Sequence, residues 1–437
     1  MQKRTYFEAA PPPSVNSKPR AIKPAPESDH ERAGRFPSVD ESLLLSLLPD
    51  YCALVFPASP IVDENGVRES ISRLRNNRDD AAFAYAYAAV TVCLTPPKEY
   101  LDASPLIADL VSRALEARSP IIHHRDLSIR RIMTSAFVRI CFGFLQEVEM
   151  EFVYLREAIT MLELLHLQHS SEGSQMDFRD RVTLERLHWV LFIHERNFVI
   201  AHEVQPLLTV PPPSPENASD LPRHVREGFD RLIALYSLLD EDFFRNWREK
   251  DESPLLTLEW IEGKQTELNQ QLEKLQVAQS ILSEIQRADL IVTGQWIRTL
   301  VWQMAMSKHL LSSVAAQDYM LLLFPVQRSA YLRRVLEKIS RQSLEQQGRS
   351  IFQKLFELIN TAADVVSLAG QFGNDEDMIN WRDDCVYLIH YLQDFRGLDP
   401  MLEKILREKL QALESLQLTD LHAGSPVTRD HGSVMPW

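Results

Sequence analysis

The feature that most constrains the fold is a long apolar segment between residues 186 and 206. Its hydrophobic side chains recur at three- and four-residue steps and also fill most of the opposite side of the expected helix. They are Leu187, Trp189, Val190, Leu191, Phe192, Ile193, Phe198, Val199, Ile200 and Ala201. A helix that is apolar almost all round belongs inside a large core. Gln205, Pro206 and the prolines at 211–213 then end it, because proline lacks a backbone N–H and disfavours helix before it.

The charged residues Arg186, Glu195 and Arg196 lie within this apolar segment. A buried charge is tolerated only when it is paired or hydrogen-bonded. We therefore expect Glu195 to pair with Arg186 or Arg196 inside the protein. We also expect Trp189 to be largely enclosed.

The same segment resembles the signature helix of the fungal-specific transcription factor domain, the middle homology region of fungal zinc-cluster transcription factors. The family pattern reads roughly Arg-x-x-Trp-x-Leu-Phe-x-x-Glu/Asp-Arg, followed by a proline-containing loop. The matching positions are Arg186, Trp189, Leu191, Phe192, Glu195, Arg196 and Pro206. The alternative is a buried helix of an unrelated all-α protein.

Weaker resemblance extends to both sides of this helix. The phrase from Gln295 to Gln303, which contains Trp296 and Trp302, is similar to a second signature helix of the family. The phrase from residue 56 to residue 63 is similar to a proline-containing turn near the start of the family domain.

The resemblance implies the regulatory domain of a fungal transcription factor that acts in the nucleus and controls metabolic or secondary-metabolite genes. It also implies control by a small-molecule effector or a partner protein, and frequent homodimers or pairing with another transcription factor. The family's zinc cluster needs six closely spaced cysteines, whereas the four cysteines here, at 52, 93, 141 and 385, lie far apart. Two explanations stay open: a truncated factor, or a modulator that acts through partners.

The residue pattern along the rest of the chain predicts an all-α protein, a large irregular helical bundle. Strand signals are almost absent, and only 13 glycines occur in 437 residues. We expect one helical domain over 39–418, a disordered Pro/Ser-rich basic tail at 1–38 and a disordered tail at 419–437. The first helix is expected to be capped by Ser38 or Asp40. Further helices are expected near 79–93, 102–117, 126–145, 149–168, 186–205, 223–239, 255–289, 293–313, 320–324, 335–339, 351–369, 378–395 and 402–416.

The segment 255–289 has the most regular hydrophobic spacing in the chain. Apolar residues follow alternating steps of three and four, with Gln265 and Gln279 at two of the seam positions. This spacing is compatible with a short dimerising coiled coil. The polar seam residues favour packing inside the chain instead.

Charge and hydropathy limit the partners. A net charge of −14 argues against direct specific DNA binding, because DNA is itself a polyanion. Scattered cysteines are typical of a reducing compartment. No stretch approaches the length of a membrane span, so no membrane partner is expected.

The chain shows no phosphate-binding loop, dinucleotide fingerprint or nucleophile elbow, so we expect no enzyme activity, catalytic residue or cofactor. Asp240-Glu-Asp242 is the nearest phrase to a metal site, but no second ligand follows one turn on. The histidines at 166, 169, 188, 194 and 202 lack partners at a zinc-ligand spacing and are expected at the core edge or surface. The alternative function is an all-helical enzyme or small-molecule-binding protein with a central pocket.

Overall fold

The structure is a computed structural model of the 437-residue chain. It describes residues 40–95, 102–123, 126–172, 176–209, 211–212, 220–249, 253–314, 316–369, 376–395 and 397–423. In these ranges all repeating structure is helical, and extended backbone pairs only at one isolated bridge between Ser312 and Leu321. The all-α prediction is confirmed. The tail predicted at 1–38 lies outside the described residues, as does the C-terminal tail after residue 423.

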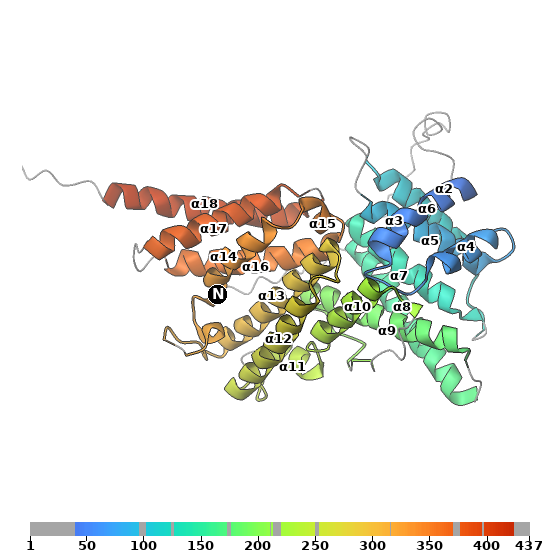
Figure 1. The fold of residues 1–437 in the computed structure, drawn as a ribbon, viewed down its shortest axis with the longest axis horizontal. Helices are drawn as coiled ribbons and strands as arrows, with labels where there is room; N and C mark the ends of the chain where they lie inside the picture. The colour runs from blue at the N-terminus through green and yellow to red at the C-terminus, as the bar shows by residue number, and fades with distance from the viewer. Residues whose placement is uncertain are drawn as a thin grey trace, which may run out of the picture. The chain divides into compact units, whose positions relative to one another are not determined.

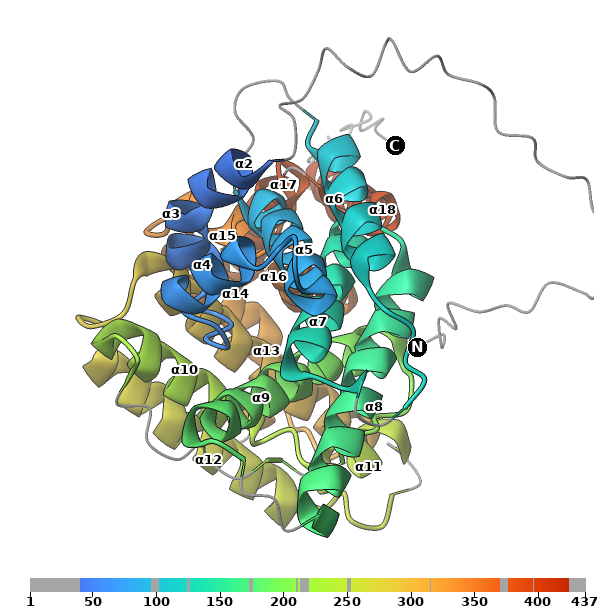
Figure 2. The ribbon, with the colours of Figure 1, turned by 90° about the vertical axis from the view of Figure 1, so that its right-hand side faces the viewer.

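The first helices form a group around the alanine-rich α5 and its neighbour α7. They are α2 (Glu41–Ser46), α3 (Leu48–Asp50), the π-helical turn η1 (Tyr51–Val55), α4 (Glu64–Ser72), α5 (Arg78–Leu94), α6 (Ser104–Ala117), α7 (Ile129–Phe144) and α8 (Val148–Glu172). Small side chains on α5 let α6 and α7 lie close beside it (Figure 2). The expected N-cap is confirmed, since the Asp40 carboxylate accepts a hydrogen bond from the Leu43 N–H at 3.0 Å.

The middle of the chain forms five helices, of which the first four pack in the first hydrophobic core and the fifth also contributes to a second core. They are α9 (Phe178–His202), α10 (Arg223–Tyr236), α11 (Glu241–Glu249), α12 (Leu258–Ala278) and α13 (Glu284–Ser307). Helix α13 contributes to both cores, because Trp296 and Leu300 lie in the first and Val292 and Trp302 lie in the second. The position of α13 therefore depends on packing on two sides.

The last helices enclose the second core around α16. They are α14 (Phe324–Leu336), α15 (Arg341–Glu345), α16 (Arg349–Ala369), α17 (Glu376–Gln393) and α18 (Pro400–Ala423). Helix α16 packs against α13, α14, α17 and α18 (Figure 1). Helix α18 continues past residue 418, the expected end of the domain.

The structure differs from the sequence prediction at α4, α11, α14 and α15 and at the long segment 255–289. In place of the short helices expected near 320–324 and 335–339, the single helix α14 spans Phe324–Leu336. Helix α4 was not expected, because the polar stretch after Pro60 reads as a turn. Asp63 nevertheless caps it by accepting a hydrogen bond from the Gly66 N–H at 2.7 Å. The segment 255–289 divides into α12 and the start of α13, where Ser283 and Gln286 form a capping box.

The seam of α12 is used inside the chain. Ile261, Gln265, Leu268 and Leu275 are buried, and α12 packs against α10 and α13. The interpretation favouring internal packing of this segment is confirmed.

Replacing Ser283 by alanine is expected to lower the free energy of unfolding by about 1 kcal/mol, because the first turn of α13 loses its cap. Urea denaturation measures this loss. Ser283→Thr keeps the hydroxyl acceptor and is the matched control, which should retain most of the stability. Equal stability of Ser283→Ala and wild type would contradict the role of the cap in starting α13.

Candidate functional site

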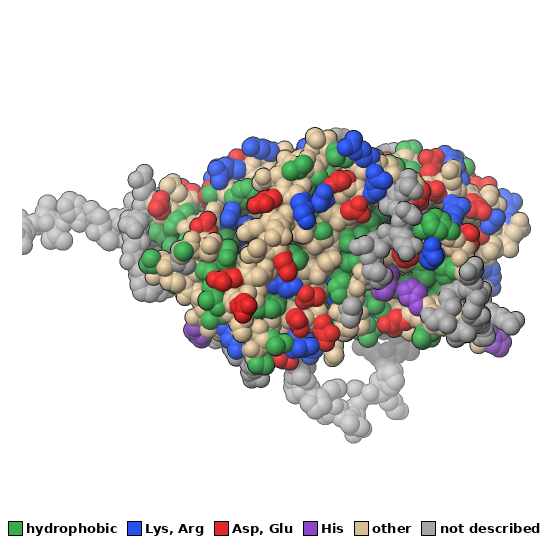
Figure 3. Space-filling view, turned by 60° about the horizontal axis from the view of Figure 1, so that its bottom comes forward, with side chains coloured by type: hydrophobic (Ala, Val, Ile, Leu, Met, Phe, Trp, Pro, Cys, Tyr) green, Lys and Arg blue, Asp and Glu red, His purple; other side chains and the backbone are tan. Residues whose placement is uncertain are grey.

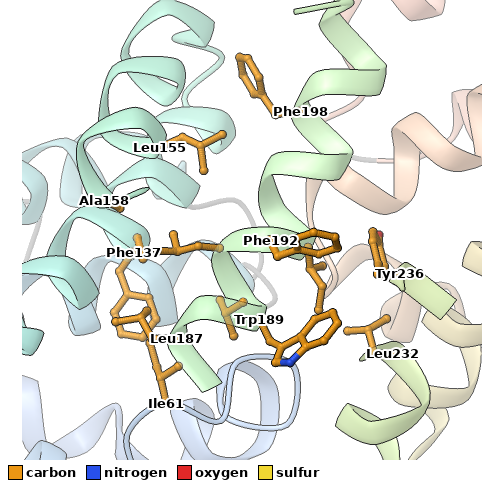
Figure 4. Packing of buried hydrophobic residues seen from close by; sticks show 14 of the residues in the cluster. Ile61, Phe137, Leu155, Ala158, Leu187, Trp189, Phe192, Phe198, Leu232 and Tyr236 are labelled. Atoms are coloured by element: carbon orange, nitrogen blue, oxygen red, sulfur yellow. The ribbon is translucent and has the colours of Figure 1, made fainter. Parts of the chain in front are cut away.

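Helix α9 carries the candidate site and runs through the interior. It packs against α7 and α8 on one side and α10 on the other (Figure 4). Trp189 is 1% exposed, as expected, and its ring meets Phe192 edge-on with ring centroids 5.3 Å apart. The helix begins at Phe178 rather than at Arg186, so the matched residues from Arg186 to Arg196 lie in its middle and second half.

Glu195 is completely buried and each carboxylate oxygen accepts two hydrogen bonds. One oxygen accepts from Arg156 of α8 at 3.1 Å and from the Leu207 N–H at 2.7 Å. The other accepts from Arg196 at 3.3 Å and from the Leu208 N–H at 2.9 Å. The carboxylate therefore exchanges its water for four protein donors, the condition under which a buried charge is stable.

Arg196 is equally buried and its guanidinium is fully engaged. Besides Glu195, it donates to the carbonyl oxygen of Leu239 at 2.9 Å and to that of Leu208. The guanidinium also lies over the ring of Phe192 at 3.8 Å and that of Phe244 at 4.7 Å. Burial lowers the pKa of Arg196 to about 10, so the side chain stays charged at neutral pH. The expected pairing of Glu195 with Arg196 is confirmed.

Arg186 has a different partner. It forms a bidentate ion pair with Asp220, in which Nη1 and Nη2 of Arg186 each donate to one carboxylate oxygen. The Nη1–Oδ2 distance is 3.1 Å. Asp220 precedes α10, so this pair joins the middle of α9 to the start of the next helix. Arg186 thus stabilises the helix packing without touching Glu195.

The loop after α9 completes the site. Glu203 adopts a left-handed backbone conformation, with φ of 52°, and ends the helix. Pro206 is buried and is followed directly by the two N–H groups that bind Glu195. Because proline fixes its own φ and donates no hydrogen bond, it shapes the loop while Leu207 and Leu208 supply the donors. We call the set Arg156, Glu195, Arg196 and the loop 204–209 the ionic centre.

A second buried polar group joins α9 to the second core. Tyr236 of α10 donates a hydrogen bond to the Asn197 side chain at 2.6 Å. The Lys354 ammonium of α16 lies 5.5 Å from the Tyr236 ring and 5.8 Å from the Trp296 ring. Lys354 donates to Asp289 of α13 at 3.1 Å. Burial disfavours its charge, but Asp289 and Tyr236 outweigh that effect and raise the pKa of Lys354.

The two tryptophans of the second resemblance lie on α13 but serve different cores. Trp296 is 3% exposed and contacts the Lys354 group in the first core. Trp302 is 1% exposed and its indole N–H donates to the Leu321 carbonyl oxygen at 2.9 Å, beside the second core. The structure brings Glu195, Arg196, Phe192 and the Pro206 loop together and leaves Arg186 and the two tryptophans apart from them.

Several histidines line the core edge. The rings of His166 and His188 are 5.3 Å apart, and burial with that neighbour lowers the pKa of His188 to about 4. Burial and Arg349 lower the pKa of His202 to about 4, against the opposing effect of Asp399. The side chain of His169 lies outside the described residues. Across the described part of the chain, no three metal-binding side chains come together.

The chemistry of the ionic centre is structural rather than catalytic. Every charge is satisfied by a neighbour, so no group is left poised to exchange a proton with a substrate. Asp240, in the acidic phrase considered for metal binding, accepts from the Phe243 N–H at 2.9 Å and pairs with Lys264 at 2.6 Å. Within the ranges that the structure describes, no helix is long and apolar enough to cross a membrane.

Comparison with known proteins gives two distant relatives. No protein-family model matches the chain. It is 20% identical over 271 residues to the probable sucrose utilization protein SUC1 of Candida albicans. The aligned residues cover 62% of this chain and 53% of that protein. It is 27% identical over 184 residues to the maltose fermentation regulatory protein MAL33 of Saccharomyces cerevisiae. The aligned residues cover 41% of this chain and 38% of that protein. The chain thus matches about half or less of each relative's length. These matches support a distant relationship to fungal transcription regulators.

Sequence reasoning did not identify Arg156, Asp220, Asp289 or Lys354. Lys354 had a visible signal, because it is a lone lysine in the apolar stretch that begins at Ile351. Arg156 gave none because it looks like any arginine in a helix of mixed polar and apolar residues, and Asp220 gave none because it lies in a polar loop.

Replacing Glu195 by alanine is expected to lower the free energy of unfolding by about 3–5 kcal/mol, because Arg196 and two backbone N–H groups lose their buried acceptor. Urea denaturation followed by circular dichroism measures the change. The control is Glu403→Ala, which removes the exposed ion pair with Arg407 and should change stability by about 1 kcal/mol or less. Equal effects of the two substitutions would contradict the assignment.

The buried histidines predict that the protein loses stability as pH falls from about 6.5 towards 4. Since the pKa of His188 and that of His202 are lower in the folded state, the unfolded state binds protons first, and stability is fully present only above the unfolded pKa. Denaturant midpoints measured at several pH values should fall across this window. Carboxylates contribute to any acid unfolding, so the specific test is His188→Gln, which should show a shallower pH dependence than wild type. An identical slope in the variant would contradict the role of His188.

Proposed function

We propose that this chain is a fungal transcription regulator whose helical body is the regulatory domain of a zinc-cluster-type factor controlling metabolic genes. The observation that carries the proposal is α9. Its residues resembling the family signature, Glu195, Arg196 and Pro206, are the ones that form the ionic centre. The likeness to two fungal proteins of sugar utilisation supports the same reading.

Regulation by such a domain would work through helix packing. An effector or partner shifts a protein between two conformations only by binding one of them more tightly. Helix α13 packs on two cores at once, and the Lys354 group links it to α10 and α16. A ligand or partner that moves α13 therefore changes the packing of both halves of the described helical body.

We assign DNA recognition to a partner or to a zinc cluster outside this chain, and we place its action in the nucleus. On the face drawn in Figure 3, acidic and basic side chains of the described residues are mixed. They form no continuous basic surface on that face. Phosphate binding depends on concentrated Lys and Arg. If the chain forms a homodimer, the contact would not use the α12 seam, which is already buried against α10 and α13.

Fusing the chain to a foreign DNA-binding domain is expected to change expression of a reporter that carries the matching site, because the regulatory domain then reaches a promoter. The unfused chain should not shift a promoter fragment in a gel at moderate salt. The matched control is the DNA-binding domain alone at equal abundance.

Reporter expression equal to that control would contradict the proposal. Turnover of a small molecule by the purified chain would favour a helical enzyme instead. The remaining alternative, a small-molecule-binding protein, is favoured by one specific observation, a cavity beside α13.

A further inference from the structure

A cavity of about 200 Å³ lies between α12, α13 and α14. Its walls are mixed: Leu272, Leu275 and Ile291 contribute apolar surface, and the polar lining residues include Asn269, Gln279, Gln295, Arg298, Arg328 and Tyr331. The exposed side chains of Glu273, Gln276 and Gln279 lie at its rim. For comparison, an apolar cavity of about 150 Å³ holds benzene. The space therefore suits a small metabolite of which part remains in water.

Arg298 is the unusual residue of this cavity. Its side chain is 7% exposed, its Nη2 donates to the Asn269 side chain, and its Nε is buried without a partner. Burial first, and then the neighbouring Arg328, lower the pKa of Arg298 to about 10, so it remains a cation at neutral pH. In the described residues no carboxylate forms an ion pair with it. A buried guanidinium in this condition lacks a counterion.

Arg328 brings a second positive charge to the same cavity. Its guanidinium lies 5.2 Å from the Phe324 ring and 6.0 Å from the Tyr331 ring, which hold it in place. Glu273 also lines the cavity, but it is exposed, and neither arginine forms an ion pair with it. Two neighbouring cations repel each other unless an anion lies between them.

The other deeply buried cations make the contrast clear. Arg196 has the Glu195 carboxylate and Lys354 has the Asp289 carboxylate. Among the buried cations of the described residues, only Arg298 has no acid paired with it, and it lines the cavity. The missing acceptor is therefore to be sought in a ligand.

We propose that the cavity binds a small phosphorylated, polyhydroxylated compound. The phosphate lies between Arg298 and Arg328, because guanidinium groups bind phosphate oxygens with charge-assisted hydrogen bonds. The side-chain amides of Gln279 and Gln295 offer both donors and acceptors, which suit hydroxyl groups. This inference rests on the proposed function, since such a ligand would be the effector of the regulatory domain.

The location of the cavity gives the ligand a route to the rest of the fold. Gln295 and Arg298 lie on α13, the helix whose Trp296 and Trp302 pack in the two cores. Neutralising Arg298 stabilises the packing of α12, α13 and α14 around the ligand. Packing around α13 is thus the step that ligand binding would bias.

Isothermal titration calorimetry on the full chain tests the proposal with three probes: glucose 6-phosphate, inorganic phosphate and glucose. Glucose 6-phosphate is expected to bind most tightly. Arg328→Gln and Arg298→Gln should each weaken its binding about tenfold or more, as expected for loss of a charge-assisted hydrogen bond. Arg328 is only partly buried, so Arg328→Gln is expected to fold and tests the proposal even if Arg298→Gln does not fold. The matched control is Arg334→Gln, an exposed arginine on the same helix, which should bind like wild type.

Three results would overturn the proposal: no saturable binding of any probe, equal binding of glucose and glucose 6-phosphate, or binding that is insensitive to both arginines. Inorganic phosphate binding as tightly as glucose 6-phosphate would overturn the role given to the amides. The reporter assay separates the two proposals. Regulation without ligand binding overturns the inference and leaves the proposed function, whereas binding without regulation overturns the proposed function and leaves the site.

Discussion

The structure depends first on the burial of one carboxylate and one guanidinium in the middle of α9. Glu195 and Arg196 are both removed from water, and a buried ion that loses its partner is strongly destabilising. Their partners come from α8, from the loop after α9, from Leu239 in the turn after α10 and from the ring of Phe244 on α11. A single pair of charges therefore links α9 to α8, to the loop that follows α9 and to the segment 239–244.

Such a centre contributes more to uniqueness than to stability. The Coulomb attraction of a buried pair is largely offset by desolvation, so an apolar replacement of both partners would stabilise as well. The pair disfavours any shifted packing of the helices. In such a packing Glu195 would lose its hydrogen bonds from the Leu207 and Leu208 N–H groups while remaining buried. The same reasoning explains why Pro206 precedes those donors. A loop that is fixed by proline presents them in one geometry.

The sequence predicted the elements whose signals are local. Helical period, caps and low glycine content were enough for the all-α class and most helices, and the apolar surroundings of Glu195 were enough to predict its pairing. The partners could not be predicted when they came from segments distant in sequence, as Arg156 and Asp220 do. The cavity could not be predicted either, because Arg298 looks like any arginine in a helix until α12 and α14 are placed beside it. Helix α4 was missed because its stability comes from Asp63 and from burial of Val67 and Ile71 rather than from a strong apolar period.

The contrast between α9 and α13 indicates which part of the fold can respond to a ligand. Movement of α9 would break a fully satisfied ionic centre, which places any such state far above the folded one in free energy. A state several kcal/mol higher stays unpopulated unless a ligand binds it with a comparable preference. Helix α13 has no such restraint at Arg298, which is a buried cation without a counterion. A shifted packing costs less free energy where the present packing leaves a charge unpaired. A regulatory change would therefore begin at α13 and α14 and use the fixed α9 as the frame against which they move.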